Sequence, residues 1–115
     1  MDIKNDNANI SIQLTDGSLT SAGTKLIICN NSESDISFGS EYSIQLSQNG
    51  AWYDIDVKNT DWTGELFTVG AGNECEVEIN WASIYGELPV GKYRIVKEYS
   101  QLGQKFFTLT EFDIP

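Results

Sequence analysis

The segment from Leu88 to Lys97 constrains the fold of this chain more than any other part of the sequence. In it, Pro89 and Gly91 precede an alternating run that opens with Tyr93. Proline fixes φ and glycine tolerates positive φ, so we expect the chain to reverse here and enter a strand. In sandwich proteins a tyrosine at the start of a late strand often turns its hydroxyl back onto the preceding connection, an arrangement called a tyrosine corner. The segment therefore predicts a position late in a Greek key, with Pro89, Gly91 and Tyr93 in structural roles.

Short alternating runs separated by turn residues predict an all-β fold. In the run Asn9–Thr15, apolar and polar residues alternate, and Asp16-Gly17 ends it with turn chemistry. The other expected strands are Lys25–Asn31, Glu41–Ser47, Ala51–Asp56, Leu66–Val69, Glu74–Asn80, Lys92–Tyr99 and Lys105–Ile114. Seven or eight strands without helical periodicity indicate an antiparallel β-sandwich of two sheets, about a hundred residues in size.

The connections carry their own signatures. Asn49-Gly50 between two alternating runs predicts a tight hairpin. The polar segment Val57–Glu65 reads as an irregular connection, Trp81–Tyr85 as a single helical turn, and Ser100–Gln104 as the loop of a closing hairpin. Trp81 continues the apolar register of the strand before it, so we expect it in the core.

Length and termini indicate one domain. A chain of 115 residues buries enough surface for a single core, so we expect a flexible segment over residues 1–8 and one sandwich domain over residues 9–115. The longest apolar run, Leu26–Cys29, is too short to cross a bilayer. The first residues lack the order of a signal peptide, so a leader would have to be missing if the protein is exported.

Charge and composition exclude several classes of function. The formal charge is -10, from 17 acids and 7 bases, which repels nucleic-acid phosphates and anionic lipid headgroups. Such acidity serves solubility, or it forms a patch for a basic partner. The sequence contains no histidine, which removes the usual general base and the commonest transition-metal ligand. We therefore expect no enzymatic activity and no cofactor.

Two groups of side chains are candidates for partner binding. Trp52, Tyr53 and Trp62 lie on or beside one hairpin, where exposed aromatics can stack on sugars or anchor a protein interface. Because neighbours on a strand face opposite ways, we expect at least one of Trp52 and Tyr53 to be buried. The second group comprises Glu74, Glu76 and Glu78, which alternate with apolar residues and form an acidic stripe on the wet face of their strand. We expect a lysine or arginine on a neighbouring strand to face this stripe.

Three further features are interpreted without a binding or catalytic role. Asp54, Asp56 and Asp61 cluster after the hairpin, but their spacing lacks a calcium-loop pattern, so we expect solvated acids and no metal. Arg94, the only arginine, is expected to pair with acids on the outer face. Strand parity sends Cys29 outward and Cys75 inward, which predicts free thiols unless a bulge resets the register.

Several motifs together resemble a family of bacterial immunoglobulin-like domains. They are Asn30-Asn31-Ser32, Phe38-Gly39-Ser40-Glu41-Tyr42, Asn49-Gly50-Ala51-Trp52-Tyr53, Asn80-Trp81, and the pattern Tyr-Gly-x-Leu-Pro-x-Gly-x-Tyr-Arg-Ile-x-Lys from Tyr85 to Lys97. The resemblance spans roughly Leu26 to Phe112. It implies an Ig-like sandwich and an extracytoplasmic setting, commonly in exported or membrane-anchored proteins of Gram-positive bacteria, and it implies no catalytic or ligand-binding residues.

These observations lead to one hypothesis and two alternatives. We expect a noncatalytic extracytoplasmic accessory module that acts as a spacer or binds an unidentified protein partner. The first alternative is an acidic inhibitor or immunity-type protein that binds a basic effector. The second is a carbohydrate-binding module that uses the exposed aromatics.

Overall fold

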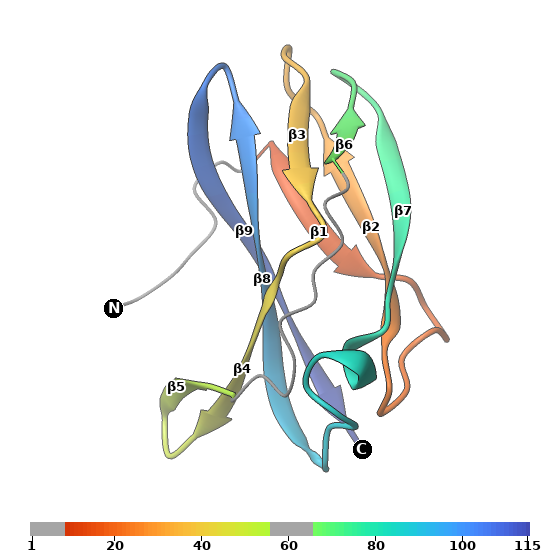
Figure 1. Cartoon of the computed structure of the whole chain (residues 1–115), viewed down its shortest axis with the longest axis vertical. Coiled ribbons are helices and arrows are strands. Elements are labelled where there is room, and N and C mark those ends of the chain that lie inside the picture. The colour runs from red at the N-terminus through yellow and green to blue at the C-terminus, as the bar shows by residue number, and fades with distance from the viewer. Residues whose placement is uncertain (1–8, 56–65) are drawn as a thin grey trace.

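The structure is a computed structural model that describes residues 9–55 and 66–115. Within these two ranges, nine strands form two antiparallel sheets that pack face to face as a β-sandwich (Figure 1). The smaller sheet has the order β1 (Ile10–Leu14), β2 (Thr24–Asn30) and β7 (Glu74–Ile79). The larger sheet contains β3 (Ile36–Gly39), β4 (Ser43–Gln48), β5 (Ala51–Asp54), β6 (Leu66–Val69), β8 (Gly91–Gln101) and β9 (Gln104–Ile114). The chain changes sheet after β2, after β6 and after β7, so the fold is the predicted Ig-like sandwich.

The larger sheet is organised around β8, the long central strand. β9 pairs with β8 over its whole length, from Gly91 opposite Ile114 to Gln101 opposite Gln104. One edge of β8 is therefore fully used, and the other edge is shared. β4 pairs with the first half of β8, and β3 pairs with it at Ser100. Between β3 and β4 the chain leaves β8, so these two strands behave as one strand with a break.

The core follows the predicted alternation on both sheets. The residues at its centre are Ile10, Leu26, Ile28, Ile36, Ile44, Trp81, Tyr93 and Ile95, each at most 2% exposed. Side chains from both sheets meet in one apolar cluster. Burial of this apolar area is the main favourable term in folding.

Trp81 fills the end of the sandwich where the chain passes from β7 to β8. The predicted helical turn is present as a 3₁₀ helix over Trp81–Ser83, and Trp81 is fully buried. Its Nε1–H donates a 2.7 Å hydrogen bond to the carbonyl oxygen of Ser21. The ring stacks on Phe112 with centroids 5.1 Å apart. This indole thus joins the β1–β2 connection to the last strand, and its expected core position is confirmed.

A close backbone approach also fixes the β1–β2 connection. A Cβ atom at Gly23 would lie 2.1 Å from the carbonyl oxygen of Ile79, so only glycine fits at this point. The amide of Ala82 donates to the carbonyl of Ala22 beside it. The connection is therefore held against the end of β7.

The structure corrects several boundaries. β3 was not predicted: its four residues follow a serine- and acid-rich segment and are too few to give a clear period. The strand expected from Glu41 begins at Ser43, because Glu41 lies in the break between β3 and β4. The two closing strands extend further than expected, so their loop has two residues, Leu102 and Gly103, both with positive φ. The described residues thus form nine strands, where seven or eight were expected.

The Asn49-Gly50 hairpin has the expected geometry. Both residues have positive φ, 54° and 81°, as a two-residue turn between twisted strands requires. The turn joins β4 to β5, the short strand at one edge of the larger sheet. The segments expected as a flexible N-terminus (1–8) and as an irregular connection (57–65) lie outside the described residues.

Candidate functional site

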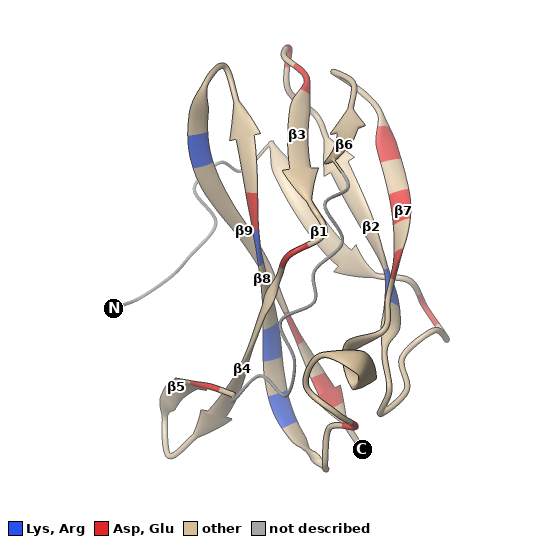
Figure 2. Cartoon of the chain, in the orientation of Figure 1, with Lys and Arg blue, Asp and Glu red and all other residues tan. Residues whose placement is uncertain are grey.

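The predicted acidic stripe lies on β7, an edge strand of the smaller sheet. Glu74, Glu76 and Glu78 are all exposed and alternate with residues that pack against the core. Figure 2 shows the acidic residues as red segments along β7. Lys25 on the neighbouring strand β2 lies opposite Glu78 and is the cation that was expected to face the stripe. The stripe also suits a structural role, because charged residues on an edge strand oppose edge-to-edge aggregation.

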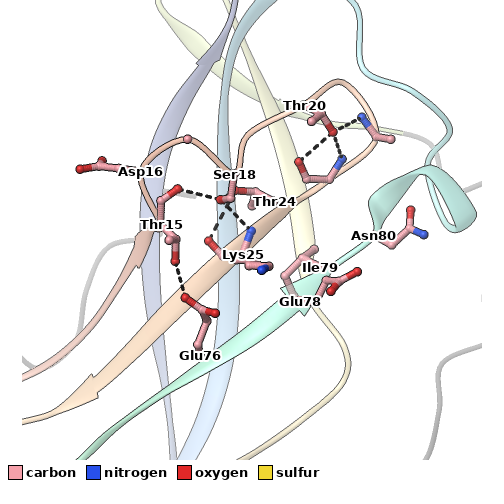
Figure 3. A pocket seen from close by; sticks show the side chains of 13 residues that line it. Thr15, Asp16, Ser18, Thr20, Thr24, Lys25, Glu76, Glu78, Ile79 and Asn80 are labelled. Carbon is pink, nitrogen blue, oxygen red and sulfur yellow. Dashed lines mark hydrogen bonds between the residues drawn. The ribbon is translucent and has the colours of Figure 1, made fainter.

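A hollow of about 510 Å³ opens beside this stripe, between the β1–β2 connection and the end of β7 (Figure 3). The Thr15 hydroxyl donates to Oε2 of Glu76 at 2.9 Å, so the hollow and the stripe share a carboxylate. The Ser18 hydroxyl donates to the Thr15 carbonyl at 2.7 Å and accepts from the Lys25 amide at 3.0 Å. These hydroxyls are therefore engaged in holding the β1–β2 connection. The charged side chains are then the main groups that the hollow offers to a partner.

Trp52 and Tyr53 face opposite sides of β5, as predicted, but neither is buried. Tyr53 is 52% exposed and Trp52 is half-buried. The expectation that one of them enters the core is wrong, because β5 is an edge strand of the larger sheet and neither ring belongs to the apolar cluster. Trp62, the third aromatic of the predicted set, lies outside the described residues.

Arg94 is 8% exposed and lies against the ring of Trp52, so it is not the solvent-exposed residue that was expected. Its guanidinium carbon lies 4.5 Å from the centroid of the Trp52 ring, and its Nε–H donates to Oε1 of Gln45 at 2.6 Å. The Gln45 amide in turn donates to Oδ1 of Asp54 at 2.9 Å. Pairing places these side chains in register on β8, β4 and β5, so they form a polar network on the outer face. This network fixes the indole and covers part of its surface.

Lys97 is the buried cation that sequence reasoning missed. It is 3% exposed and its ammonium donates to the carbonyl oxygens of Gly39 at 2.8 Å and Glu41 at 3.0 Å. The ammonium also lies 5.1 Å from the centroid of the Phe38 ring. Burial lowers the pKa of Lys97 to about 8, against a smaller opposing effect of the Glu41 charge. The lysine thus satisfies carbonyls at the break between β3 and β4. Its side chain shares the inward face of Tyr93 and Tyr99 by strand alternation, and this was the sequence signal for its burial.

A second hollow, of about 490 Å³, lies at the same break and was also missed. Its lining comprises Gly39, Glu41, Tyr42, Ser43, Tyr85, Val96, Glu98, Lys105 and Phe107. We call it the break groove. No local sequence signal marks it, because it arises where two separate strands share one edge of β8.

The two thiols are free, with the predicted parity. Cys75 packs against the core, opposite Ile28, whereas Cys29 lies one residue along β2 and bonds through its thiol to Oε2 of Glu74 at 3.4 Å. Burial raises the pKa of both thiols, and the hydrogen bond to Glu74 and its charge raise that of Cys29 further. Both thiols are therefore held in their less nucleophilic form.

A profile of the family described as "Bacterial Ig-like domain" matches residues 6–112. The chain is a bacterial Ig-like domain. No curated protein matches it. Family membership suggests a noncatalytic accessory module and agrees with the sandwich and the central strand described above.

The described residues of the Ig-like domain contain neither a cluster of metal ligands nor a helix that could span a membrane. Among residues 9–55 and 66–115, no group of three or more metal-ligating side chains is arranged to hold an ion. Of the aspartates considered as calcium ligands, Asp54 accepts from Gln45, and Asp56 and Asp61 lie outside the described residues. Within the same ranges, no helix has the length and hydropathy of a membrane span.

Proposed function

We propose that this Ig-like domain is a noncatalytic extracytoplasmic module that binds a protein partner through its acidic surface. The observation that carries the proposal is the division of the charged residues between core and surface. Lys97 and Arg94, the buried cations of the described residues, bind backbone carbonyls and a glutamine, so they hold the sandwich together. Exposed glutamates instead dominate the surface of β7 and the rim of the break groove.

An extracytoplasmic setting is supported by the family, whose members are often extracellular. Proteolytic shaving of intact native cells tests it. Peptides from the domain should be released by trypsin without lysis, while a cytoplasmic marker protein is retained. Release only after lysis would contradict the extracytoplasmic proposal.

Cross-linking on intact cells tests the interaction. A partner should be recovered with the domain, and the purified pair should bind more weakly as salt rises, because exposed charges are screened. Salt-insensitive binding would contradict the acidic surface as the binding feature. Recovery of no cross-linked partner would contradict protein binding and favour a spacer.

The acidic inhibitor is the second candidate, and the stripe on β7 is the observation that favours it. Glu74, Glu76 and Glu78 present carboxylates at every second residue of β7, which among the described residues pairs with β2 alone, so a basic strand could pair with its other edge. Inhibition of a basic effector by the purified domain, lost in the variant E74Q/E76Q/E78Q, would establish it. The carbohydrate alternative has less support, because Arg94 lies over the Trp52 ring.

A further inference from the structure

The break groove exists because of the way the larger sheet is paired. β4 pairs with β8 as far as Val96, and β3 resumes pairing at Ser100. Between these points the segment 40–42 leaves β8, while β9 continues along the opposite edge. The groove of about 490 Å³ fills this gap and is large enough for a long side chain.

The groove has an apolar base and a charged rim. Tyr42, Tyr85 and Val96 are at most 9% exposed and form the base. Glu41 and Glu98 are exposed, and they contribute two carboxylates to the rim. Phe107, which is 38% exposed, lies directly opposite Glu98 on β9.

Contacts beneath the groove hold its wall in place. The Lys97 ammonium binds the carbonyl oxygens of Gly39 and Glu41 from the core side. The Tyr85 hydroxyl accepts from the Ile44 amide at 3.4 Å and lies 3.5 Å from the Tyr42 carbonyl oxygen, to which it donates. The wall is thus fixed before any ligand arrives, which lowers the ordering cost of binding.

A cation of the chain itself already lies on the rim. The Lys105 ammonium is 3.5 Å from Oε1 of Glu98, and its side chain is 75% exposed. Exposed ion pairs of this kind contribute little to stability, so another cation can displace this one. The pair shows that the Glu98 carboxylate at the rim is accessible to an ammonium group.

We propose that the break groove binds an arginine or lysine side chain of a basic protein partner. The proposal rests on the proposed function and deepens it by naming the site and the chemistry of the partner. Carboxylates attract cations, and the formal charge of -10 steers basic segments toward the domain. A sugar is disfavoured because Tyr42 and Tyr85 are too buried to offer a ring face for stacking.

The test titrates the isotope-labelled domain with a short capped peptide that has a central arginine, and follows backbone amides by NMR. A peptide with citrulline in place of arginine controls for shape without charge. We expect shifts around Glu41, Glu98 and Phe107 with the arginine peptide, smaller shifts with citrulline, and weaker binding at high salt. Shifts of equal size with the arginine and citrulline peptides, or with the arginine peptide and a neutral oligosaccharide, would overturn the proposal.

Matched variants separate the groove from general acidity. E41Q/E98Q and E76Q/E78Q each remove two negative charges, the first pair from the groove and the second from β7. We expect E41Q/E98Q to weaken peptide binding about three- to tenfold and E76Q/E78Q to change it less than about twofold. Equal effects, or a larger effect of the β7 variant, would overturn the groove as the site while leaving the proposed protein-binding function intact.

A second pair of variants predicts a gain of affinity. K105Q removes the cation that occupies Glu98, so the arginine peptide should bind about twofold more tightly. K92Q is the control, because Lys92 makes the equivalent exposed pair with Glu111 on the same two strands, at 3.3 Å. An equal gain in both variants would show a long-range charge effect and contradict the groove. If no arginine peptide binds but the cross-linked native partner does, the groove proposal fails and the proposed function stands.

Discussion

The hydroxyl of Tyr93 donates a 2.7 Å hydrogen bond to the carbonyl oxygen of Pro89, four residues earlier in the chain. This bond closes the turn that delivers the chain into β8, so it is the predicted tyrosine corner. Gly91 is the first residue of β8 and lacks the positive φ expected of it at the turn; an added Cβ there would be 3.4 Å from the Tyr93 ring. The ring also stacks on Phe112 with centroids 5.7 Å apart. Turn, central strand and last strand are therefore joined at one side chain.

Removing the hydroxyl of Tyr93 should destabilise the domain without changing its fold. In Y93F the ring still packs on Phe112, but the Pro89 carbonyl loses its donor. We expect the free energy of unfolding to fall by about 1–2 kcal/mol, measured by urea denaturation. Y53F is the control, because Tyr53 is 52% exposed, and its stability should be unchanged. Equal losses in the two variants would contradict the structural role of the corner.

The strands that the sequence predicts well are those in which apolar and polar residues alternate. Alternation from Ile10 to Leu14 and from Glu74 to Ile79 predicts both strands nearly to the residue, because one face of each is buried. The four residues of β3 carry only two core side chains, Ile36 and Phe38, which is too short a period to recognise. Their strand identity comes from pairing with β6 and β8, a tertiary cause.

The candidate sites were less predictable for related reasons. The stripe on β7 follows from parity alone, so it was found. Lys97 has inward parity, but lysine is rarely buried, and only the carbonyls exposed by the strand break explain its position. The burial of Arg94 depends on Trp52 in a different strand. The break groove is a product of strand pairing and has no local signature.

The contact between Arg94 and Trp52 should appear as an energetic coupling. In a double-mutant cycle with R94M and W52A, we expect a coupling free energy of about 0.5–2 kcal/mol, because the guanidinium lies over the ring in a buried setting. A parallel cycle with K92M and W52A controls for general charge effects, since the Lys92 side chain is 55% exposed. A coupling in the Arg94 cycle no larger than in the Lys92 cycle would contradict the stacked arrangement.

The two thiols should be free and slow to react. Burial raises the pKa of both, so less thiolate is present in the native domain at pH values near neutrality than in the unfolded chain. We expect a disulfide reagent to label two thiols per chain and to do so faster in urea. In single variants, C29S should leave the slower thiol, because Cys75 packs against the core. Labelling of the native domain at the urea rate would contradict this expectation.

Lys97 should give the stability of the domain a characteristic dependence on pH. Burial lowers its pKa in the native state to about 8 from 10.5, while the unfolded chain keeps the ordinary value. Between these two values the unfolded state therefore binds more protons than the native state. Stability from this group must rise with pH across that window, and the unfavourable effect of its buried charge is fully present below it.

Comparison with K97M isolates this effect, because the variant lacks only the titrating amine. From pH 7 to pH 10.5, the free energy of unfolding of the wild type should rise relative to that of K97M by at most about 3 kcal/mol. Other groups titrate in both proteins, so their contributions largely cancel in the difference. Urea denaturation of the two proteins across this range measures it. Curves that stay parallel from neutral to alkaline pH would show that the ammonium bound to Gly39 and Glu41 keeps its ordinary pKa.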